Sequence, residues 1–215
     1  ATLVVLAALV GGVGHAGAAD AAPATAASSP ASATQPAISP GAATATAQEN
    51  CSFPLSLTDS TGTDVTLAEA PEDVVVLGAS DAQTIWELGE REHVVGMPVD
   101  ASTAYLNGSA DRTHVLDGVR VQTETVVDLE PDLVIAPGGG FIAAEDVQAL
   151  RDAGITVYVG NDGSSLADVR ERVSTTGRLL GACGAVDETV AWMDEQLAVV
   201  ENATGNVDRP STYYY

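Results

Sequence analysis

A row of glycines at the end of an apolar segment is the feature of this sequence most suited to binding chemistry. The stretch "LEPDLVIAPGGGF" (129–141) runs from an acidic residue and a proline through an apolar burst to Gly138, Gly139 and Gly140, and then to Phe141. Glycine lets a ligand approach backbone N–H groups closely, because no Cβ stands in the way. The sequence therefore predicts a binding site here, although the glycines do not identify the ligand.

Catalytic and metal-binding patterns are missing around this segment. The stretch "PGGGFIAAED" (137–146) has neither the GxGxxG spacing of a dinucleotide loop nor the lysine of a P-loop. No GxSxG motif is present, and no histidine lies near Ser164. His93 and His114 form no HxxxH or HExxH pair, so we expect no dedicated zinc or manganese site. Since all these motifs are missing, we also expect that the protein is not an enzyme and needs no cofactor.

Four apolar bursts separated by helical segments must position the loops that bind the ligand. The bursts are "DVVVLGA" (73–79), "HVVGM" (93–97), "PDLVIAP" (131–137) and "GITVYVG" (154–160). Each is short, rich in β-branched residues and apolar on both faces, which is typical of strands in a covered parallel sheet. Before them, "FPLSLTDSTGTDVTL" (53–67) has two alternating runs around a Ser-Thr-Gly turn and predicts a β-hairpin.

This alternation predicts an α/β fold, a parallel sheet flanked by helices with right-handed crossovers. Ligands of such sheets bind outside the carboxyl ends of the strands. The loops after the four bursts, which include residues 78–81, 98–100, 138–141 and 161–164, are therefore expected to converge on one rim.

Capping patterns mark the ends of the intervening helices. Ser80 and Gln83 have the spacing of a capping box before "TIWELG", with Gly89 as the stop. Ser165 and Asp168 form a second capping-box pattern before another amphipathic helix. Between them, the acidic first turn of "AAEDVQALRDAG" (143–154) indicates a further helix.

The last helix is predicted from a single apolar stripe. Its members recur at intervals of four, three, four and three residues: Val186, Val190, Met193, Leu197 and Val200. A stripe of this kind is typical of a helix that packs on a core along its length, and we expect ordinary core packing.

Three longer stretches are similar to one known family. They are "PEDVVVLGASDAQTIWELGEREHVVGMP", "ETVVDLEPDLVIAPGGG" and "LRDAGITVYVGNDGSSLADV", in the order in which the family has them. They resemble the substrate-binding proteins of ABC importers for iron siderophores, cobalamin and haem, the periplasmic-binding-protein class with a helical backbone. The resemblance covers about residues 53–215 and rests on the order of the motifs, since none is decisive alone.

Members of this family have two α/β lobes joined by a long helix, and the ligand lies between the lobes. The resemblance implies that residues 51–182 form the amino-terminal, Rossmann-like ligand-binding lobe and residues 183–206 the interlobe helix. Residues 207–215 would then begin a second lobe that is truncated here, which makes the chain a fragment of a longer product.

The resemblance also implies a set of ligand-binding residues on the rim. They are Ser80, Asp81, Gln83, Asp100, Tyr105, Gly138, Gly139, Gly140, Phe141, Asp162, Gly163 and Ser164. A bulky planar chelate favours aromatic faces, which Tyr105 and Phe141 offer, and a few polar anchors.

Other residues near the rim have two interpretations each. Trp86 suits ligand contact or core and interlobe packing, and Arg112 and Arg120 suit a ligand carboxylate or ion pairs with neighbouring acids. Glu124 stands where cobalamin-binding relatives dock an acidic residue onto an arginine of the permease. It equally suits a favourable negative charge in the first turn of a helix.

The charge of the chain excludes two classes of partner. The formal net charge is −22, and no lysine is present. Nucleic acids and anionic membranes would be repelled by such a surface. Strong self-repulsion that salt can screen is typical of haloarchaeal-like, halophilic proteins, and we favour that interpretation over an ordinary acidic protein.

The amino-terminal residues indicate export. Residues 1–18 resemble part of a signal peptide with a small-residue cleavage site, and residues 19–50 have the Ala/Pro/Ser/Thr-rich composition of a disordered tether. In an exported protein, Cys51 and Cys183 are expected to form a disulfide, which we favour over a lipid anchor on Cys51.

Together, these features predict a monomeric extracytoplasmic solute-binding component of an ABC importer, tethered to the cell surface. It would capture a metal chelate or corrinoid (ferric siderophore, cobalamin or haem) and deliver it to the ABC permease. Two alternatives remain, a tethered cell-surface interaction protein without a small ligand and a metal-ion-binding relative.

Overall fold

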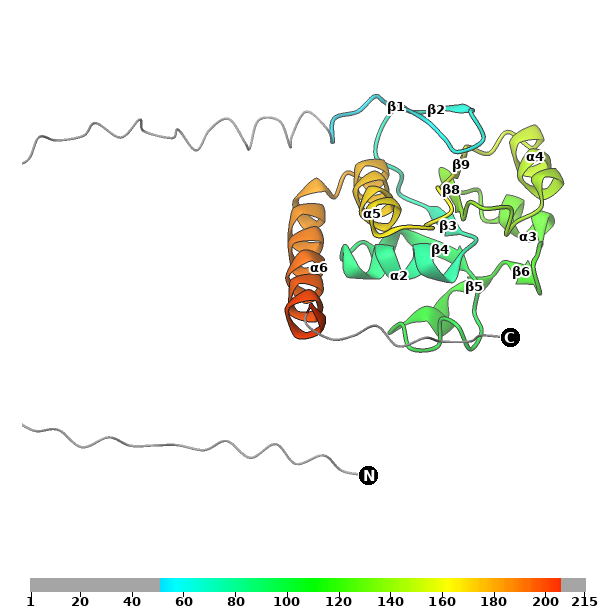
Figure 1. Ribbon diagram of the computed structural model, residues 1–215. Helices are drawn as coiled ribbons and strands as arrows, with labels where there is room; N and C mark the ends of the chain where they lie inside the picture. Colours follow the sequence, from blue (N-terminus) through cyan, green and yellow to red (C-terminus); the bar gives the residue numbers. More distant parts are fainter. Residues whose placement is uncertain (1–50, 206–215) are drawn as a thin grey trace, which may run out of the picture. The chain divides into compact units, whose positions relative to one another are not determined.

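A parallel sheet of five strands organises the fold (Figure 1). The computed structural model describes residues 51–205, so the predictions for residues 1–50 and 206–215 lie outside the described residues. The strand order is β5-β4-β3-β8-β9, and every neighbouring pair is parallel. The strands are β3 (Val74–Val76), β4 (Val94–Met97), β5 (Thr113–His114), β8 (Leu133–Ala136) and β9 (Val157–Val159). Four of them confirm the strands that the four apolar bursts predicted, while the short edge strand β5 was not predicted.

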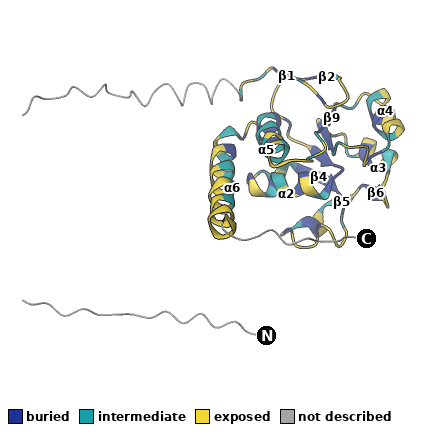
Figure 2. Cartoon of the chain, in the orientation of Figure 1, coloured by how far each residue is buried: buried dark blue, intermediate teal, exposed yellow. Residues whose placement is uncertain are grey.

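Both faces of the sheet are buried, as the doubly apolar bursts predicted. Val74 and Val76 lie in one apolar cluster, and Val75 between them lies in another on the opposite face. Successive strand residues point to opposite faces, so each face needs its own cover. Figure 2 shows strands such as β4 and β9 in dark blue in the interior of the fold, whereas the edge strand β5 is exposed.

Helices cover the two faces of the sheet. On one face, α2 (Ala79–Glu87) and α5 (Leu166–Leu180) contribute Ile85 and Leu179 to the apolar cluster around Val74. On the other, α3 (Thr123–Asp128) and α4 (Ala144–Asp152) contribute Val126 and Leu150. This arrangement is the predicted α/β fold.

Short elements complete the described region. The hairpin of β1 (Leu55–Thr58) and β2 (Asp64–Leu67) is antiparallel, which confirms the hairpin prediction. A second hairpin, which was not predicted, pairs β6 (Leu116–Asp117) with β7 (Arg120–Val121). Two 3-10 turns lie beside β4 and before β5: η1 (Arg91–His93) and η2 (Ser109–Asp111).

The two predicted capping boxes had different outcomes. Ser165 caps α5 as predicted, because its Oγ accepts the Asp168 N–H at 3.1 Å while Asp168 Oδ2 accepts the Ser165 N–H at 2.8 Å. The capping box of Ser80 and Gln83 was wrong, since α2 begins at Ala79, directly after the strand, and its N-cap is Gly78.

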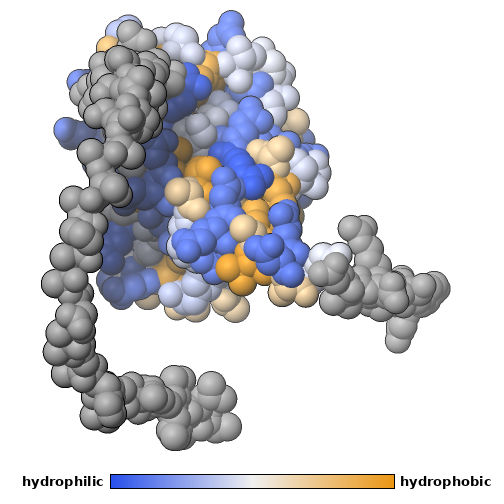
Figure 3. Space-filling view, turned by 60° about the vertical axis from the view of Figure 1, so that its left-hand side comes forward, coloured by the Kyte–Doolittle hydropathy of each residue, from blue (hydrophilic) through white to orange (hydrophobic). Residues whose placement is uncertain are grey.

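The apolar stripe of α6 (Cys183–Thr204) is buried only at its start, and it is half-buried at Val190, Met193 and Leu197. Val186 is buried against α5, whereas Val200 near the other end is 57% exposed and Trp192 is 62% exposed. The prediction of core packing along the whole stripe was therefore wrong. The helix has 22 residues against 15 in α5, and Asp194 still pairs with Arg170 of α5, so only the last turns of α6 extend past the helix on which it packs. In Figure 3, which turns this side forward, hydrophobic residues lie exposed among hydrophilic ones.

A disulfide joins the two cysteines that the sequence analysis pairs. Cys51 and Cys183 lie 132 positions apart in the sequence, with their Cα atoms 6.0 Å apart. The bridge ties the segment before β1 to the first residue of α6, at the end where α6 packs on α5.

The close approach of α5 and α6 gives a testable prediction. A Cβ on Gly177 of α5 would lie 2.1 Å from Cγ2 of Val186 on α6, whereas a Cβ on Gly184 would meet no atom within 4 Å. Gly177→Ala should therefore lower the free energy of unfolding by about 1–3 kcal/mol through overpacking. Urea unfolding at constant high salt measures it. Gly184→Ala is the matched control and should cause no loss, and equal effects of the two substitutions would contradict the predicted contact.

Candidate ligand-binding site

The loops that follow β3, β8 and β9 meet around one pocket at the carboxyl edge of the sheet. This rim pocket has a volume of about 290 Å³ and is lined by Gly78, Ala79, Ser80, Pro137, Gly138, Phe141, Asp162 and Arg172. Four of the predicted ligand-binding residues are in this set: Ser80, Gly138, Phe141 and Asp162. Strands β3, β8 and β9 are adjacent and parallel, so their carboxyl ends necessarily lie side by side.

Aromatic surface is available beside the pocket. Phe141 is 59% exposed and Tyr105 is 62% exposed, so both rings are accessible to a ligand. Phe141 lines the rim pocket itself. The Tyr105 hydroxyl donates to Gln83 Oε1 at 3.0 Å, so the ring is fixed to the exposed side of α2.

The loop after β4 forms its own turn, and its predicted residues do not line the rim pocket. Asp100 Oδ1 accepts the Ser102 N–H at 2.7 Å and the Ser102 hydroxyl at 2.6 Å. The bond from the Ser102 hydroxyl, followed by that from the Ser102 N–H, lowers the pKa of Asp100. Asp100, Tyr105 and Gln83 are exposed and do not belong to the lining of the rim pocket.

The glycine row has structural reasons that the sequence did not reveal. A Cβ on Gly138 would lie 2.2 Å from the carbonyl oxygen of Gly160, so the loop after β8 can pack against the loop after β9 only without a side chain. Gly139 and Gly140 have φ angles of 73° and 75°, in the left-handed region. Chain packing alone therefore requires these glycines, whether or not a ligand contacts them.

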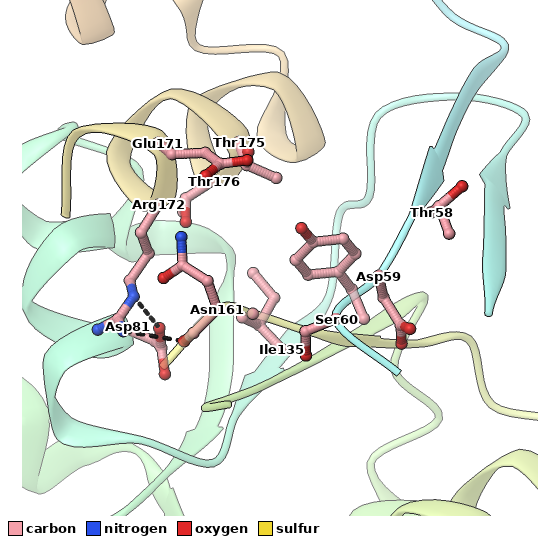
Figure 4. A pocket seen from close by; sticks show the side chains of 12 residues that line it. Thr58, Asp59, Ser60, Asp81, Ile135, Asn161, Glu171, Arg172, Thr175 and Thr176 are labelled. Carbon is pink, nitrogen blue, oxygen red and sulfur yellow. Dashed lines mark hydrogen bonds and ion pairs between the residues drawn. The ribbon is translucent and has the colours of Figure 1, made fainter. Parts of the chain in front are cut away.

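Arg172 of α5 is the residue of this site that the sequence analysis missed. Its Nη1 donates to Ser80 Oγ at 3.2 Å. Its Nη2 donates to the carbonyl oxygen of Asn161 at 3.0 Å, which Figure 4 shows. A Cβ on Gly163 would lie 2.4 Å from Nη2, so the backbone of Gly163 passes close beside the guanidinium. Arg172 thereby joins the loops after β3 and β9.

A helical arginine gives little warning of such a role, because basic residues on amphipathic helices are typical of solvated faces. The available signal was the position of Arg172 beside buried Val173 and one turn before buried Thr176. That spacing places Arg172 at the edge of the packed face of α5 rather than on its outer face.

Asp81 lies beneath the rim and not on it. Its exposed fraction is 1%, and its Oδ1 is 4.0 Å from Nε of Arg172. Burial raises the pKa of Asp81 from 3.8 to about 6, although the positive charge of Arg172 opposes this shift. Oδ2 of Asp81 and Nε of Arg172 are both buried and have no hydrogen-bond partner within residues 51–205. The expectation of a ligand-facing Asp81 is therefore corrected, since α2 starts early enough to turn this side chain inward.

A second cavity lies on the other side of Arg172. This inner cavity has a volume of about 240 Å³, and its polar lining includes Asp59, Asp81, Tyr158, Asn161, Glu171 and Arg172. Figure 4 shows Arg172 and Asp81 together at one side of it, with Asp59 at the other. Arg172 thus contributes to both the inner cavity and the rim pocket.

Asp59 has a structural role at the far side of the inner cavity. Its buried carboxylate accepts the N–H groups of Thr61, Thr63 and Val159 and forms an ion pair with Arg151. Burial by itself raises the pKa of Asp59, but the hydrogen bond from the Thr61 hydroxyl, together with those from the three N–H groups, outweighs burial, and the pKa is lowered. The carboxylate therefore fastens the β1–β2 turn to β9.

The remaining predicted residues are accounted for individually. Asp162 Oδ1 accepts the Ser164 N–H at 3.2 Å, and the Ser164 hydroxyl donates to Asp168, so this loop is fixed to the start of α5. Trp86 is partly buried and donates its indole N–H to the carbonyl oxygen of Asn107. Glu124 is exposed in the first turn of α3.

Neither of the two arginines named from the sequence lines the rim pocket. Arg112 donates to the carbonyl oxygen of Arg91 at 3.1 Å, and Arg120 is exposed on β7. The two histidines, His93 and His114, do not contact each other, since His93 contacts Glu90 and His114 Nδ1 accepts the Val99 N–H. No group of three or more His, Cys, Asp or Glu side chains in the described region is arranged to hold a metal ion.

Comparison with known families agrees with this architecture. Residues 74–215 match the model of the periplasmic binding proteins. The chain belongs to this family. Among curated relatives, it is 42% identical over 192 residues to a cobalamin-binding protein of Halobacterium salinarum, which covers 87% of this chain and 50% of that protein. It is 29% identical over 158 residues to the ABC transporter substrate-binding lipoprotein YvrC of Bacillus subtilis, with 73% and 49% covered.

Solved structures of periplasmic binding proteins have the same fold. The haem-binding protein HmuT superimposes with a TM-score of 0.58 at 25% identity, covering 70% of this chain and 50% of that one. PiuA, an iron-uptake substrate-binding protein of Streptococcus pneumoniae, superimposes with a TM-score of 0.63 at 21% identity, covering 72% and 55%. The chain spans about half the length of the curated relatives it matches. No helix among residues 51–205 is long and apolar enough to cross a membrane.

Asp81 gives a prediction for this site. Its pKa in the folded state, about 6, is above the value of 3.8 expected in the unfolded chain. Between these values the folded state holds a proton that the unfolded state has lost, so stability from this group falls as pH rises from about 4 to about 6 and stays low above that. Relative to the wild type, Asp81→Asn should therefore gain about 2 kcal/mol of unfolding free energy between pH 4 and pH 7.

Urea unfolding of both proteins across that pH range, at constant high salt, measures the difference. Asp162→Asn, which changes an exposed carboxyl at the rim, is the control and should show no such change. If the difference in unfolding free energy between Asp81→Asn and the wild type stays constant from pH 4 to pH 7, the raised pKa of the buried Asp81 carboxyl is contradicted.

Proposed function

We propose that this chain is the amino-terminal part of an exported, surface-tethered solute-binding component of an ABC importer, which captures a metal chelate or corrinoid. The observation that carries the proposal is the rim pocket, where three loops meet at the carboxyl edge of the sheet beside exposed Phe141. The similarity of the chain to a cobalamin-binding protein makes cobalamin the first ligand to test, followed by haem and ferric siderophores.

The two-lobe arrangement of the family is part of this proposal. Residues 51–182 would form the amino-terminal lobe, residues 183–206 the interlobe helix and residues 207–215 the start of the second lobe. The exposed apolar side chains of α6, which are Trp192 near its middle and Val199 and Val200 near its end, support a helix that contacts more of the protein than α5 alone. Because such a helix is stiff, lobe closure would be a modest rocking motion.

The size of the rim pocket also supports a shared site. A volume of about 290 Å³ is at the lower end of small-molecule pockets, which reach about 1,000 Å³. A corrinoid or haem would therefore place only one edge in this pocket, and the second lobe would cover the rest.

Ligand titration of the full-length product tests the proposal directly. Cyanocobalamin, haem and a ferric hydroxamate siderophore are titrated at constant high salt, with tryptophan fluorescence and calorimetry as the measurements. Saturable binding of one of them with 1:1 stoichiometry is expected. Absence of binding with all three probes would contradict the proposal and favour a cell-surface interaction protein. If a metal ion titrated alone binds instead, a metal-ion-binding relative is favoured.

Phe141 provides a specific prediction for the same assay. Phe141→Ala should weaken binding of the captured ligand about fivefold to tenfold without unfolding the lobe, because an exposed aromatic face is lost while the core is untouched. Val127→Ala, at the other end of the lobe on α3, is the matched control and should leave the affinity unchanged. Equal affinities of the Phe141 variant and the wild type would remove this loop from the site.

Glu124 is proposed to dock the lobe onto the permease. It is exposed in the first turn of α3, and Asp128 is exposed at the end of the same helix. Glu124→Arg should abolish ligand-stimulated ATPase activity of the reconstituted importer while leaving the ligand affinity unchanged. Asp128→Arg is the control and should retain stimulation. If the Glu124 variant stimulates the ATPase activity normally, Glu124 does not dock onto the permease, and its role is limited to a favourable interaction with the helix N-terminus.

A further inference from the structure

Arg172 is built into the fold in a way that its own hydrogen bonds do not explain. A guanidinium has five N–H donors, and the described residues accept from only two of its nitrogens, Nη1 and Nη2. Nε is buried without a hydrogen-bond partner, and its nearest carboxylate oxygen, Oδ1 of Asp81, is 4.0 Å away. A buried charged group with unused donors costs stability, so its retention calls for a reason.

The surroundings hold the guanidinium in place at the wall of the rim pocket. Ser80 fixes it from the loop after β3, and Asn161 fixes it from the loop after β9. Gly163 has no side chain, and any Cβ there would collide with Nη2. The side chain is 15% exposed, and it lines the rim pocket. An arginine immobilised before binding loses little conformational freedom when it donates to a ligand.

The charge around the rim pocket favours an anionic group at this position. Arg172 is the one basic residue among the residues that line the pocket. The acidic residue in the same lining, Asp162, accepts the N–H of Ser164, so part of its charge is already satisfied within its own loop. On a chain of net charge −22, an anionic ligand group needs a local cation to overcome repulsion.

We propose that Arg172 is the anchor that recognises an anionic oxygen group, a phosphodiester or a carboxylate, on the captured ligand. Asp81 beneath it is a positioning residue that holds the guanidinium against the loops from the inner-cavity side. This inference rests on the proposed function, because it concerns the ligand of the same pocket. It adds the chemical class of the group that enters the pocket first and the residue that selects it.

The test compares ligands that differ in their anionic groups. Cyanocobalamin carries a phosphodiester, dicyanocobinamide is a corrinoid without it, and haem carries carboxylates. Each is titrated into full-length wild type, Arg172→Gln and Arg170→Gln. Arg170, two residues earlier on α5, pairs with Asp194 and serves as the matched control for the loss of one positive charge.

We expect Arg172→Gln to weaken the binding of the anionic ligand by at least about tenfold, the effect of losing a hydrogen bond to a charged group. Dicyanocobinamide should bind the Arg172 variant within about twofold of wild type, and Arg170→Gln should match wild type for every probe. An effect on cyanocobalamin identifies the phosphodiester as the recognised group, and an effect confined to haem identifies the carboxylates.

A second variant separates a loss of stability caused by Arg172→Gln from a loss of ligand recognition. Removing Arg172 leaves the Asp81 carboxyl buried without its cation, so the double variant Asp81→Asn, Arg172→Gln should regain thermal stability but not affinity. Affinity restored together with stability, an equal loss for dicyanocobinamide, or unchanged affinity of Arg172→Gln for the anionic probes would overturn the inference. Failure of the wild type to bind any of these probes or the ferric hydroxamate siderophore would instead overturn the proposed function.

Discussion

Burial of both faces of the parallel sheet is the constraint on which the rest of the described structure depends. Val74, Val75 and Val76 of the central strand β3 are completely buried, with helices on each side. A sheet covered on both faces offers a ligand only its edges, and the parallel direction of the strands places all their outgoing loops at one of them. The rim pocket is therefore a consequence of the sheet, and the loops decide only its chemistry.

Contacts between those loops give the rim its definite shape. Gly138 allows the loop after β8 to lie directly on the loop after β9, and Arg172 joins the latter to Ser80 at the start of α2. The cost of this arrangement is a buried carboxyl, Asp81, with an oxygen that has no partner in the described region. Such a compromise beside a pocket is common where a protein keeps polar groups ready for a ligand.

The long helix α6 has a different character from the helices on the sheet. It is anchored at its first residue by the disulfide to Cys51 and by the contact of Val186 with Gly177. Beyond that point the side chains of its apolar stripe are only half-buried, and Val199 and Val200 near its end are exposed. Its periodic stripe is the same along its length, so the sequence pattern alone does not reveal where the packing partner ends.

The sequence by itself determined the main elements and their order: four doubly apolar strands, the first hairpin, the capped start of α5 at Ser165 and the glycine that ends α2. These depend on local periodicity and capping, which neighbouring residues specify. Only the tertiary structure decided which side chains share the rim pocket, because that depends on contacts between segments far apart in the chain. Asp81 was expected at the rim and lies buried, Arg172 was overlooked on a helix 91 positions later, and Gly138 serves the backbone of Gly160. Burial of a charged side chain is set by what packs around it, and no local pattern records that.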